Sequence, residues 1–371
     1  MASAFPGALD SFTLNVDNVD DVLAADMNLV QDAALAIETY LQSSHIGENL
    51  LYHSMTHNIW PEGIVLNDLA DDTYVAAVWN IVSSANTPDI SAIDGVSTEP
   101  MSKYFRCIMD AASQQVGLLQ FLSYEDTAKL RGTTLSLGFD AWGTNITALR
   151  AAVLYSTAAN DVFASDVVGT WATGNQTLVT NWFYANTPSV DITISSTRAR
   201  KEVEGIVIPT TANNIAVFIW TPNPEASGDL FNITRVKLEI GDVCTPFSTP
   251  GFQAEQNRSQ FFVERITSED DNFTYFGSGM CYSTTHALIP VRYKTPKFKV
   301  PTITSSAAST FAAQLSSAGA QAGTAISFAR ATKFGVGEVD ITVASGLVAG
   351  NATNLLSNNG STTYIQADAR L

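Results

Sequence analysis

The N-terminal part of the chain carries apolar residues at the spacing of a helix. Six of them follow one another at intervals of 4, 3, 4, 3 and 4 residues, like the a and d positions of a coiled coil: Leu23, Met27, Val30, Ala34, Ile37 and Leu41. A helix with fewer than three heptads is marginal in water and needs a partner. We therefore expect a short, coiled-coil-like oligomerising helix within residues 1–47. An amphipathic helix docked on its own domain is the alternative.

From about Asn49 to Pro250 the pattern changes to short runs rich in Thr, Val, Ile and aromatic residues, separated by Gly, Pro and Asn. We find no alternation of strands with helices and no repeat of about 20–50 residues. The spacing predicts a jelly-roll β-sandwich over residues 48–250, with a short helix around Pro100–Ala112. The strands that we expect are Tyr74–Ser83, Thr133–Ala141, Ala148–Tyr155, Val190–Ser195, Gly205–Ile208, Asn214–Trp220 and Asn232–Glu239.

Residues 251–371 predict a connector helix at 253–265 and then a smaller C-terminal β domain. The stretch 304–324 consists almost wholly of Ser, Ala, Thr, Gln and Gly, which is typical of a flexible loop or linker. The predicted strands are Ala287–Tyr293, Phe298–Ile303, Ser327–Ala331, Val339–Val343 and Thr362–Gln366. The fold class expected for the whole chain is therefore mainly β.

Composition limits the classes of partner. Thirty-six acidic residues against nineteen basic ones give a net charge of −17, which disfavours nucleic acid and anionic membranes. Only 15% of the 371 residues are charged, which indicates surface hidden in an oligomer. The three cysteines form no CxxC pair, and neither a secretory signal nor an apolar run of about 18 residues is present. We expect no membrane insertion, and folding in a reducing cytoplasm.

Three stretches carry a resemblance to a known family: NLLYHSMTHNIWPEG from Asn49, LRGTTLSLGFDAW near residue 130, and NITRVKLEIGDVCTPFSTPGFQAEQNRSQFF from Asn232. Together they resemble the carbohydrate-binding-module-like jelly-roll domain of phage and prophage tail-fibre and virion structural proteins. The shared elements are Leu238-Glu239, Gly241, Thr245-Pro246-Phe247 and the following Gln256–Phe262. The segment KFKVP at 297–301 and the ending ADARL are similar to the C-terminal module of such proteins.

The opening FPGALDSF, with the helix that follows it, resembles the start of phage appendage proteins. The resemblance implies a homotrimer in the virion, whose N-terminal segment attaches to other virion proteins. It also implies binding of host-surface carbohydrate.

The residues for catalysis, cofactors or metals do not form a recognisable pattern. His53 and His57 have the spacing of metal ligands on a helix, but no HExxH glutamate lies between them and their surroundings are strand-like. No GxSxG, P-loop or GxGxxG motif supports an enzyme. The run Glu269-Asp270-Asp271 could supply catalytic carboxylates or bind Ca²⁺, although a solvated hairpin tip is the simpler interpretation. We predict no catalytic residue, no metal site and no cofactor.

Carbohydrate binding needs an aromatic ring on a face turned away from the core. In the strand from Leu135 onward, odd positions are apolar and even ones polar, so Trp142 and Asp140 should share the solvent face. In Asn214–Trp220, either both faces are buried or Phe218 and Trp220 form a platform. The candidate ligand-binding residues are Trp142, Asp140, Trp171, Tyr184 and Trp220. Packing in the core or in a trimer interface is the alternative use of these rings.

The sequence thus predicts a non-enzymatic virion appendage, similar to a tail fibre or tailspike, that binds host-surface glycan. One alternative is a head fibre or capsid decoration protein that stabilises the shell. A second alternative is a polysaccharide depolymerase.

Overall fold

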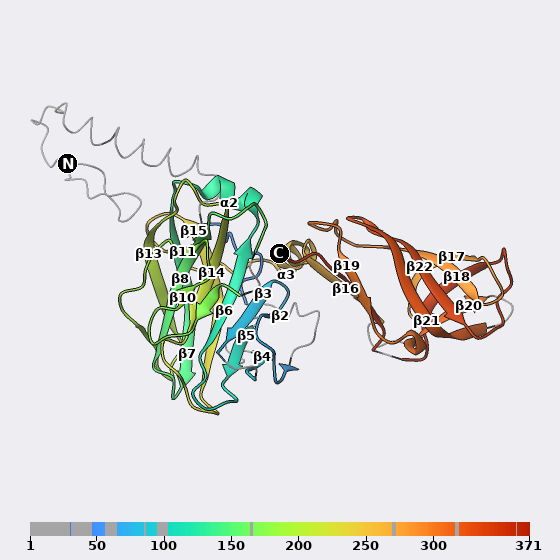
Figure 1. Cartoon of the computed structure of the whole chain (residues 1–371), viewed down its shortest axis with the longest axis horizontal. Coiled ribbons are helices and arrows are strands. Elements are labelled where there is room, and N and C mark those ends of the chain that lie inside the picture. Colours follow the sequence, from blue (N-terminus) through green and yellow to red (C-terminus); the bar gives the residue numbers. More distant parts are fainter. Residues whose placement is uncertain are drawn as a thin grey trace, which may run out of the picture.

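The computed structural model describes residues 30, 47–55, 65–84, 87–94, 103–163, 166–268, 272–315, 319–360 and 362–371. Strands dominate these residues, and they form a sandwich followed by a smaller β region (Figure 1). The prediction of a mainly β fold with a central sandwich is therefore confirmed. Of the predicted coiled-coil seam only Val30 is described, as helical and 54% exposed; the other five positions lie outside the described residues.

The sandwich consists of two antiparallel sheets. The first has the order β1-β4-β5-β15-β7-β13, and the second has the order β11-β8-β14-β6-β3-β2 with β12 also paired to β8. The first sheet contains β1 (Val65–Leu66), β4 (Asp89–Asp94), β5 (Lys103–Ile108), β15 (Leu230–Ile240), β7 (Thr134–Thr144) and β13 (Ala199–Val207). The second contains β11 (Trp182–Tyr184), β8 (Ala148–Ser156), β14 (Asn214–Trp220), β6 (Val116–Leu122), β3 (Trp79–Ser83), β2 (Thr73–Val75) and β12 (Ile192–Thr193).

Two apolar layers stabilise the second sheet, one on each face. The main core lies between the two sheets and receives Ile215, Val217 and Ile219 of β14. The other face of β14, with Phe218 and Trp220, is covered by the segment 166–184, which includes the ribbon β9 (Val168–Thr170) and β10 (Thr177–Leu178). Burial on both faces explains why β14 reads as an unbroken apolar run, and it excludes an exposed aromatic platform there.

The helix expected around Pro100–Ala112 is wrong, because residues 103–108 form strand β5. Phe105 and Cys107 point alternately into the core, and this packing overrides the local composition. A helix that the pattern did not reveal, α2 (Tyr124–Leu130), follows β6 instead. Its N-cap Ser123 accepts a hydrogen bond from Asp126 N, so the helix begins on a local polar signal and not on an apolar stripe.

The C-terminal region begins with α3 (Phe252–Gln260), which confirms a helix in the predicted connector 253–265, although residues 263–265 belong to the strand that follows. A three-stranded sheet follows in the order β16-β24-β19, and then a closed antiparallel barrel in the cyclic order β17-β18-β22-β21-β20-β23. The sheet contains β16 (Val263–Thr267), β24 (Tyr364–Asp368) and β19 (Thr302–Ser305). The barrel contains β17 (Tyr275–Cys281), β18 (His286–Arg292), β22 (Gly335–Val343), β21 (Gly319–Thr332), β20 (Phe311–Leu315) and β23 (Ala352–Ser357).

The flexible linker predicted for residues 304–324 is wrong where the structure describes it. This stretch holds a 3-10 turn at Ala308–Thr310, all of β20 and the beginning of β21. Small side chains are required here, because Ala312 and Ala313 are fully buried. A Cβ on Gly323 would also lie 2.5 Å from the Ala308 carbonyl oxygen.

The sandwich and the C-terminal region are in direct contact. Phe262 and Phe298 pack against Tyr52 and Val78 of the sandwich. Beside them Arg370 reaches back across the boundary, and the chain end lies between the two parts in Figure 1. Among the helices of the described residues, none has the length and apolar character required to cross a membrane.

Candidate ligand-binding site

The outer face of the six-stranded sheet is polar, as the alternation along β7 predicts. Leu137, Phe139 and Ala141 are fully buried in the core between the sheets. The intervening residues, which include Asp140 and Trp142, therefore point to the opposite face. Trp142 is half-buried and Asp140 is 7% exposed, so other side chains cover much of the Asp140 carboxylate.

The strands beside β7 bring three arginines to Asp140. Arg200 of β13 is paired with Asp140 on one side, and Thr234 of β15 is paired with it on the other. A β-bulge follows Thr234, where Arg235 has a φ of +53°. The extra residue turns Arg235 to the same outer face, which is a known use of bulges beside binding sites.

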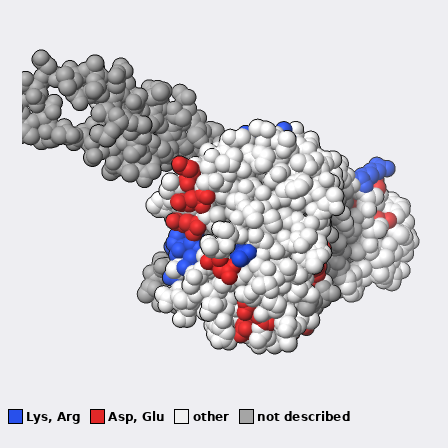
Figure 2. Space-filling model, turned by 60° about the vertical axis from the view of Figure 1, so that its left-hand side comes forward, with Lys and Arg blue, Asp and Glu red and all other residues white. Residues whose placement is uncertain are grey.

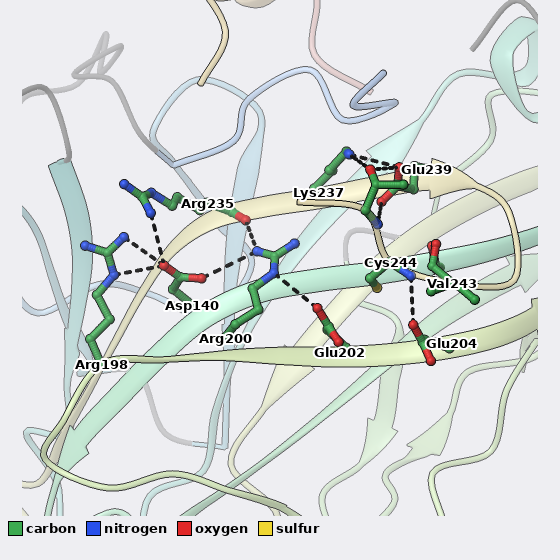
Figure 3. A network of polar contacts seen from close by, with 12 residues as sticks. Asp140, Arg198, Arg200, Glu202, Glu204, Arg235, Lys237, Glu239, Val243 and Cys244 are labelled. Carbon is green, nitrogen blue, oxygen red and sulfur yellow. Dashed lines mark hydrogen bonds and ion pairs between the residues drawn. The ribbon is translucent and has the colours of Figure 1, made fainter. Parts of the chain in front are cut away.

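Asp140 is the centre of a network of guanidinium groups (Figure 3). Arg198, just before β13, donates from Nε and Nη2 to Asp140 Oδ2 at 2.9 and 2.7 Å. Arg200 Nη1 lies 3.5 Å from Oδ1, and Arg235 Nη1 lies 3.8 Å from Oδ2. Arg200 Nη1 also donates to the Arg235 carbonyl oxygen at 2.8 Å, which links β13 and β15, the two strands that flank β7.

Gly138 provides the space in which the Arg200 guanidinium lies. A Cβ at this position would be 2.1 Å from Arg200 Nη2 and 2.7 Å from its Cζ. Any other residue at 138 would therefore displace Arg200 from its place on the sheet. The glycine is required for close approach, and not for an unusual backbone conformation.

An aromatic pair extends the face on the side of β5. The rings of Tyr104 and Trp142 meet edge to face with their centroids 4.8 Å apart. Arg106 Nη2 donates to the Tyr104 hydroxyl at 3.1 Å, and Arg198 Cζ lies 6.0 Å from the Trp142 ring centroid. The aromatic pair and the arginine network thus form one continuous surface.

A cavity of about 610 Å³ adjoins the arginine network. Its lining residues are Asp140, Arg198, Ala199, Arg200, Glu202, Arg235, Cys244, Pro246 and Phe247. The segment 242–247 forms one wall, because Ser136 Oγ donates to the Val243 carbonyl oxygen at 3.1 Å and Cys244 N donates to Glu204 Oε1 at 2.8 Å. The volume is within the usual range of ligand pockets.

A buried ion pair of β15 holds the segment 242–247, the wall of the cavity, in place. Lys237 Nζ lies 2.8 Å from Glu239 Oε2, and both side chains are almost fully buried. Thr245 donates to the same carboxylate from its backbone N at 2.7 Å and from its hydroxyl at 2.6 Å. These contacts hold the segment 242–247 against the sheet, so the cavity has a defined shape.

The remaining predicted ligand residues belong to the other sheet. Trp171 and Tyr184 pack against the apolar layer that contains Trp220. Tyr184 donates its hydroxyl to the Gln176 carbonyl oxygen at 2.9 Å, and the fully buried Trp220 donates Nε1 to the Gly174 carbonyl oxygen at 2.9 Å. The structure therefore does not bring these three residues to the site of Trp142 and Asp140.

The residues that sequence reasoning missed are Tyr104, Arg198, Arg200 and Arg235. Tyr104 lies in the segment expected to be helical. A signal did exist for Arg198 and Arg200, because Arg198, Arg200, Glu202 and Glu204, in and just before β13, alternate with period two. No local pattern marks Arg235, since its orientation depends on the bulge.

Within the described part of the chain, two clusters of carboxylates could hold a metal ion by their geometry: Asp68, Asp89 and Asp110, and Asp71, Asp72 and Asp166. Neither is at the cavity lining. The buried ring of His53 stacks on Phe105 with centroids 5.6 Å apart, while His57 and the run 269–271 lie outside the described residues.

The chemistry of the site favours binding over catalysis. Both oxygens of Asp140 face guanidinium groups, which suits this carboxylate to positioning the arginines. Burial, with a smaller contribution from the nearby Glu202 and Glu204 carboxylates, raises the pKa of the Cys244 thiol to about 11, so a thiolate nucleophile is disfavoured.

Comparison with protein families gives no match, and comparison with curated protein sequences gives no significant one. Solved structures overlap about half of the chain at low scores. The C-terminal family 22 carbohydrate-binding module of a Clostridium thermocellum protein is 14% identical, with a TM-score of 0.31, over 49% of this chain and 97% of that one. The module TmCBM61, solved with β-1,4-galactotriose, is 14% identical with a TM-score of 0.27 over 47% of this chain and 97% of its own.

The enzymatically active domain of tailspike protein 4 of bacteriophage CBA120 is 13% identical, with a TM-score of 0.30. That alignment covers 47% of this chain and 21% of the tailspike chain. What the outer face of the sheet can bind follows from its own side chains.

Proposed function

We propose that this protein binds glycans without turnover, through the outer face of β5, β15, β7 and β13. The observation that carries the proposal is the Tyr104–Trp142 pair beside a cavity lined by arginine and carboxylate side chains. Sugars present apolar C–H faces and many hydroxyl groups. Aromatic rings can accept the C–H faces, and charged groups bind the hydroxyls by strong hydrogen bonds.

The open, extended form of the site also fits a glycan. An oligosaccharide needs an extended surface and not a closed pocket. The aromatic pair, the arginine network and the cavity wall formed by residues 242–247 lie on the same face of one sheet. The register of the paired strands fixes the distances between them. Sites on such a rigid scaffold need little reordering when the ligand binds.

The resemblance of the sequence to phage appendage proteins supports a virion context for this binding. In our proposal the segment 1–47 forms a trimeric bundle and attaches the protein to other virion proteins. Three linked sites then bind a host surface together, because the second and third contacts occur at high effective concentration. Weak affinity at a single site is sufficient for adhesion under these conditions.

The test is binding of the full-length protein to a glycan array that includes bacterial surface polysaccharides. We expect Trp142→Ala to lower the affinity for the bound glycan by about tenfold or more, since it removes an aromatic contact. Trp171→Ala is the matched control, because Trp171 is also half-buried but packs on the opposite sheet.

Loss of binding in Trp171→Ala with retention in Trp142→Ala would move the site to the other sheet. Binding to purified capsids in place of any glycan would favour the decoration protein. Release of reducing ends from a bound polysaccharide would establish an enzyme.

A further inference from the structure

We propose that the glycan bound on this face carries an acidic group, a carboxylate or a sulfate or phosphate ester, which the arginines of the cavity recognise. This inference rests on the proposed glycan binding and specifies its ligand class. The charge of the cavity differs from that of the chain as a whole. The chain has a net charge of −17, whereas three guanidinium groups and two carboxylates line the cavity.

On the face of the sandwich seen in Figure 2, the charged side chains are unevenly distributed. Figure 2 shows acidic and basic groups gathered together on one side, beside a broad surface that carries almost none. Concentrating cations in one place costs repulsion that a dispersed arrangement avoids. Arginine clusters of this kind are common where a protein binds carboxylates or phosphates, because the guanidinium fork matches an oxyanion.

The Asp140 carboxylate cannot accept hydrogen bonds from all the N–H donors of Arg198, Arg200 and Arg235. Each guanidinium group has five N–H donors, whereas one carboxylate offers about four acceptor positions. Only Arg198 makes close hydrogen bonds to Asp140; Arg200 and Arg235 lie at 3.5 and 3.8 Å. Arg200 Nη1 also donates to the Arg235 carbonyl oxygen at 2.8 Å, so a second oxyanion in the cavity would add a charged acceptor to the network and not fill an empty place in it.

Asp140 acts as a positioning residue in this arrangement. Its charge reduces the repulsion among the three guanidinium groups and holds Arg198 in one orientation. Arg198 in turn lies 6.0 Å from the Trp142 ring centroid. A sugar ring on Trp142 therefore places a substituent within reach of the arginines, which connects the aromatic and the anionic parts of the site.

The experiment uses matched pairs of polysaccharides on one array. Each acidic member, with uronic acid, sialic acid, sulfate or phosphate, is printed beside the same polymer after carboxyl reduction or removal of the ester. We expect wild-type protein to bind acidic members about tenfold or more tightly than their neutral counterparts, as loss of charge-assisted hydrogen bonds requires. Which chemical treatment abolishes binding identifies the acidic group.

Equal binding to both members of the pairs would overturn the inference and leave glycan binding intact. Binding to no glycan, acidic or neutral, would overturn the inference and the proposed function together.

Variants then locate the effect. Arg200→Gln should weaken binding of the acidic polymer and leave binding of the neutral one nearly unchanged. Arg150→Gln is the control, since it removes the same charge from β8, where Arg150 pairs with Asp191 at 2.6 Å on the other sheet. An equal loss of affinity for the acidic and the neutral polymer in Arg200→Gln would contradict anion recognition. Thermal unfolding is used to check that each variant is folded.

Asp140→Asn distinguishes the positioning of the arginines from the net charge of the site. Loss of positioning should lower the affinity for the acidic polymer, whereas loss of a negative charge should raise it. If Asp140 positions the arginines, affinity for the acidic polymer falls although the site becomes more positive. A rise in affinity would show that the arginines attract the polymer by their charge alone. That result would contradict the proposal that Asp140 holds them in a defined orientation.

Discussion

At the scale of single residues, the positions of some side chains in the site can be predicted from the sequence, and those of others cannot. Trp142 and Asp140 follow from the alternation along one strand, which is a local property. Arg200 and Arg235 reach Asp140 only through the pairing of strands far apart in the sequence. The aromatic half of the site was therefore predictable in part, whereas the arginine network needed the sheet register and the bulge at Arg235.

Gly138→Ala tests the geometry of the network without changing any charge. The new methyl group would occupy the place of the Arg200 guanidinium, so Arg200 must move. We expect a loss of affinity for the acidic polymer similar to that of Arg200→Gln, measured by isothermal titration calorimetry.

The control is Gly251→Ala, because no atom lies within 4 Å of a Cβ at that position. Unchanged affinity in Gly138→Ala, in a folded protein, would show that the position of Arg200 does not matter for binding.

At the scale of secondary-structure elements, the run Asn214–Trp220 was predicted well, whereas Tyr74–Ser83, expected as one strand, is a hairpin of β2 and β3, and segments of small or mixed residues were predicted poorly. The bounds expected for Asn214–Trp220 agree with β14, since burial on both faces gives an unbroken apolar run. Strand β20 was missed because Ala312 and Ala313 are selected for their small size inside the barrel, which composition alone cannot distinguish from a linker. Strand β5 was missed because its alternation is short.

The connector between the sandwich and the barrel depends on one buried ion pair. Lys297 Nζ lies 2.7 Å from Glu264 Oε2 and also donates to the carbonyl oxygens of Gln260 and Thr295. Burial lowers the pKa of Lys297, and the carboxylate of Glu264 opposes this effect. The pair thus joins the end of α3, strand β16 and the loop before β19.

Lys297→Met should lower the free energy of unfolding by about 3–5 kcal/mol, because it leaves the Glu264 carboxylate buried without its cation. Urea unfolding measures the change. Lys299→Met is the control, since Lys299 is exposed. The double variant Lys297→Met/Glu264→Gln should recover part of the lost free energy of unfolding. If the effects of the two substitutions simply add, Lys297 and Glu264 are not coupled.

At the scale of the whole molecule, the sandwich and the C-terminal region share an interface. The Arg370 guanidinium lies 4.2 Å from the centroid of the Tyr74 ring and donates to the Ala77 carbonyl oxygen at 3.2 Å. It also pairs with Asp368 of β24. One side chain therefore connects the three-stranded sheet to the sandwich, next to the aromatic cluster of Phe262 and Phe298.

Arg370→Ala should weaken this coupling, because it removes both the carbonyl hydrogen bond and the contact with the Tyr74 ring. We expect the thermal unfolding of the variant, followed by calorimetry, to separate toward two transitions. A single transition at the wild-type temperature would show that the apolar contacts alone hold the two parts together.

The proposed trimer is tested at the same scale. Ile37→Asp should reduce the oligomer from three times the chain mass of 39.7 kDa toward one chain, since a charge would enter the predicted seam. Light scattering after size-exclusion chromatography measures the mass. An unchanged mass would place the oligomer contacts elsewhere in the chain.

A crystal structure of the protein with the acidic glycan that it binds most tightly would locate the ligand on the sheet. We expect a sugar ring against Trp142 and Tyr104, with its acidic group at hydrogen-bond distance from Arg200 or Arg235. Glycan bound on the barrel, or on the β8–β14–β6 sheet, with the arginine face empty would contradict this expectation.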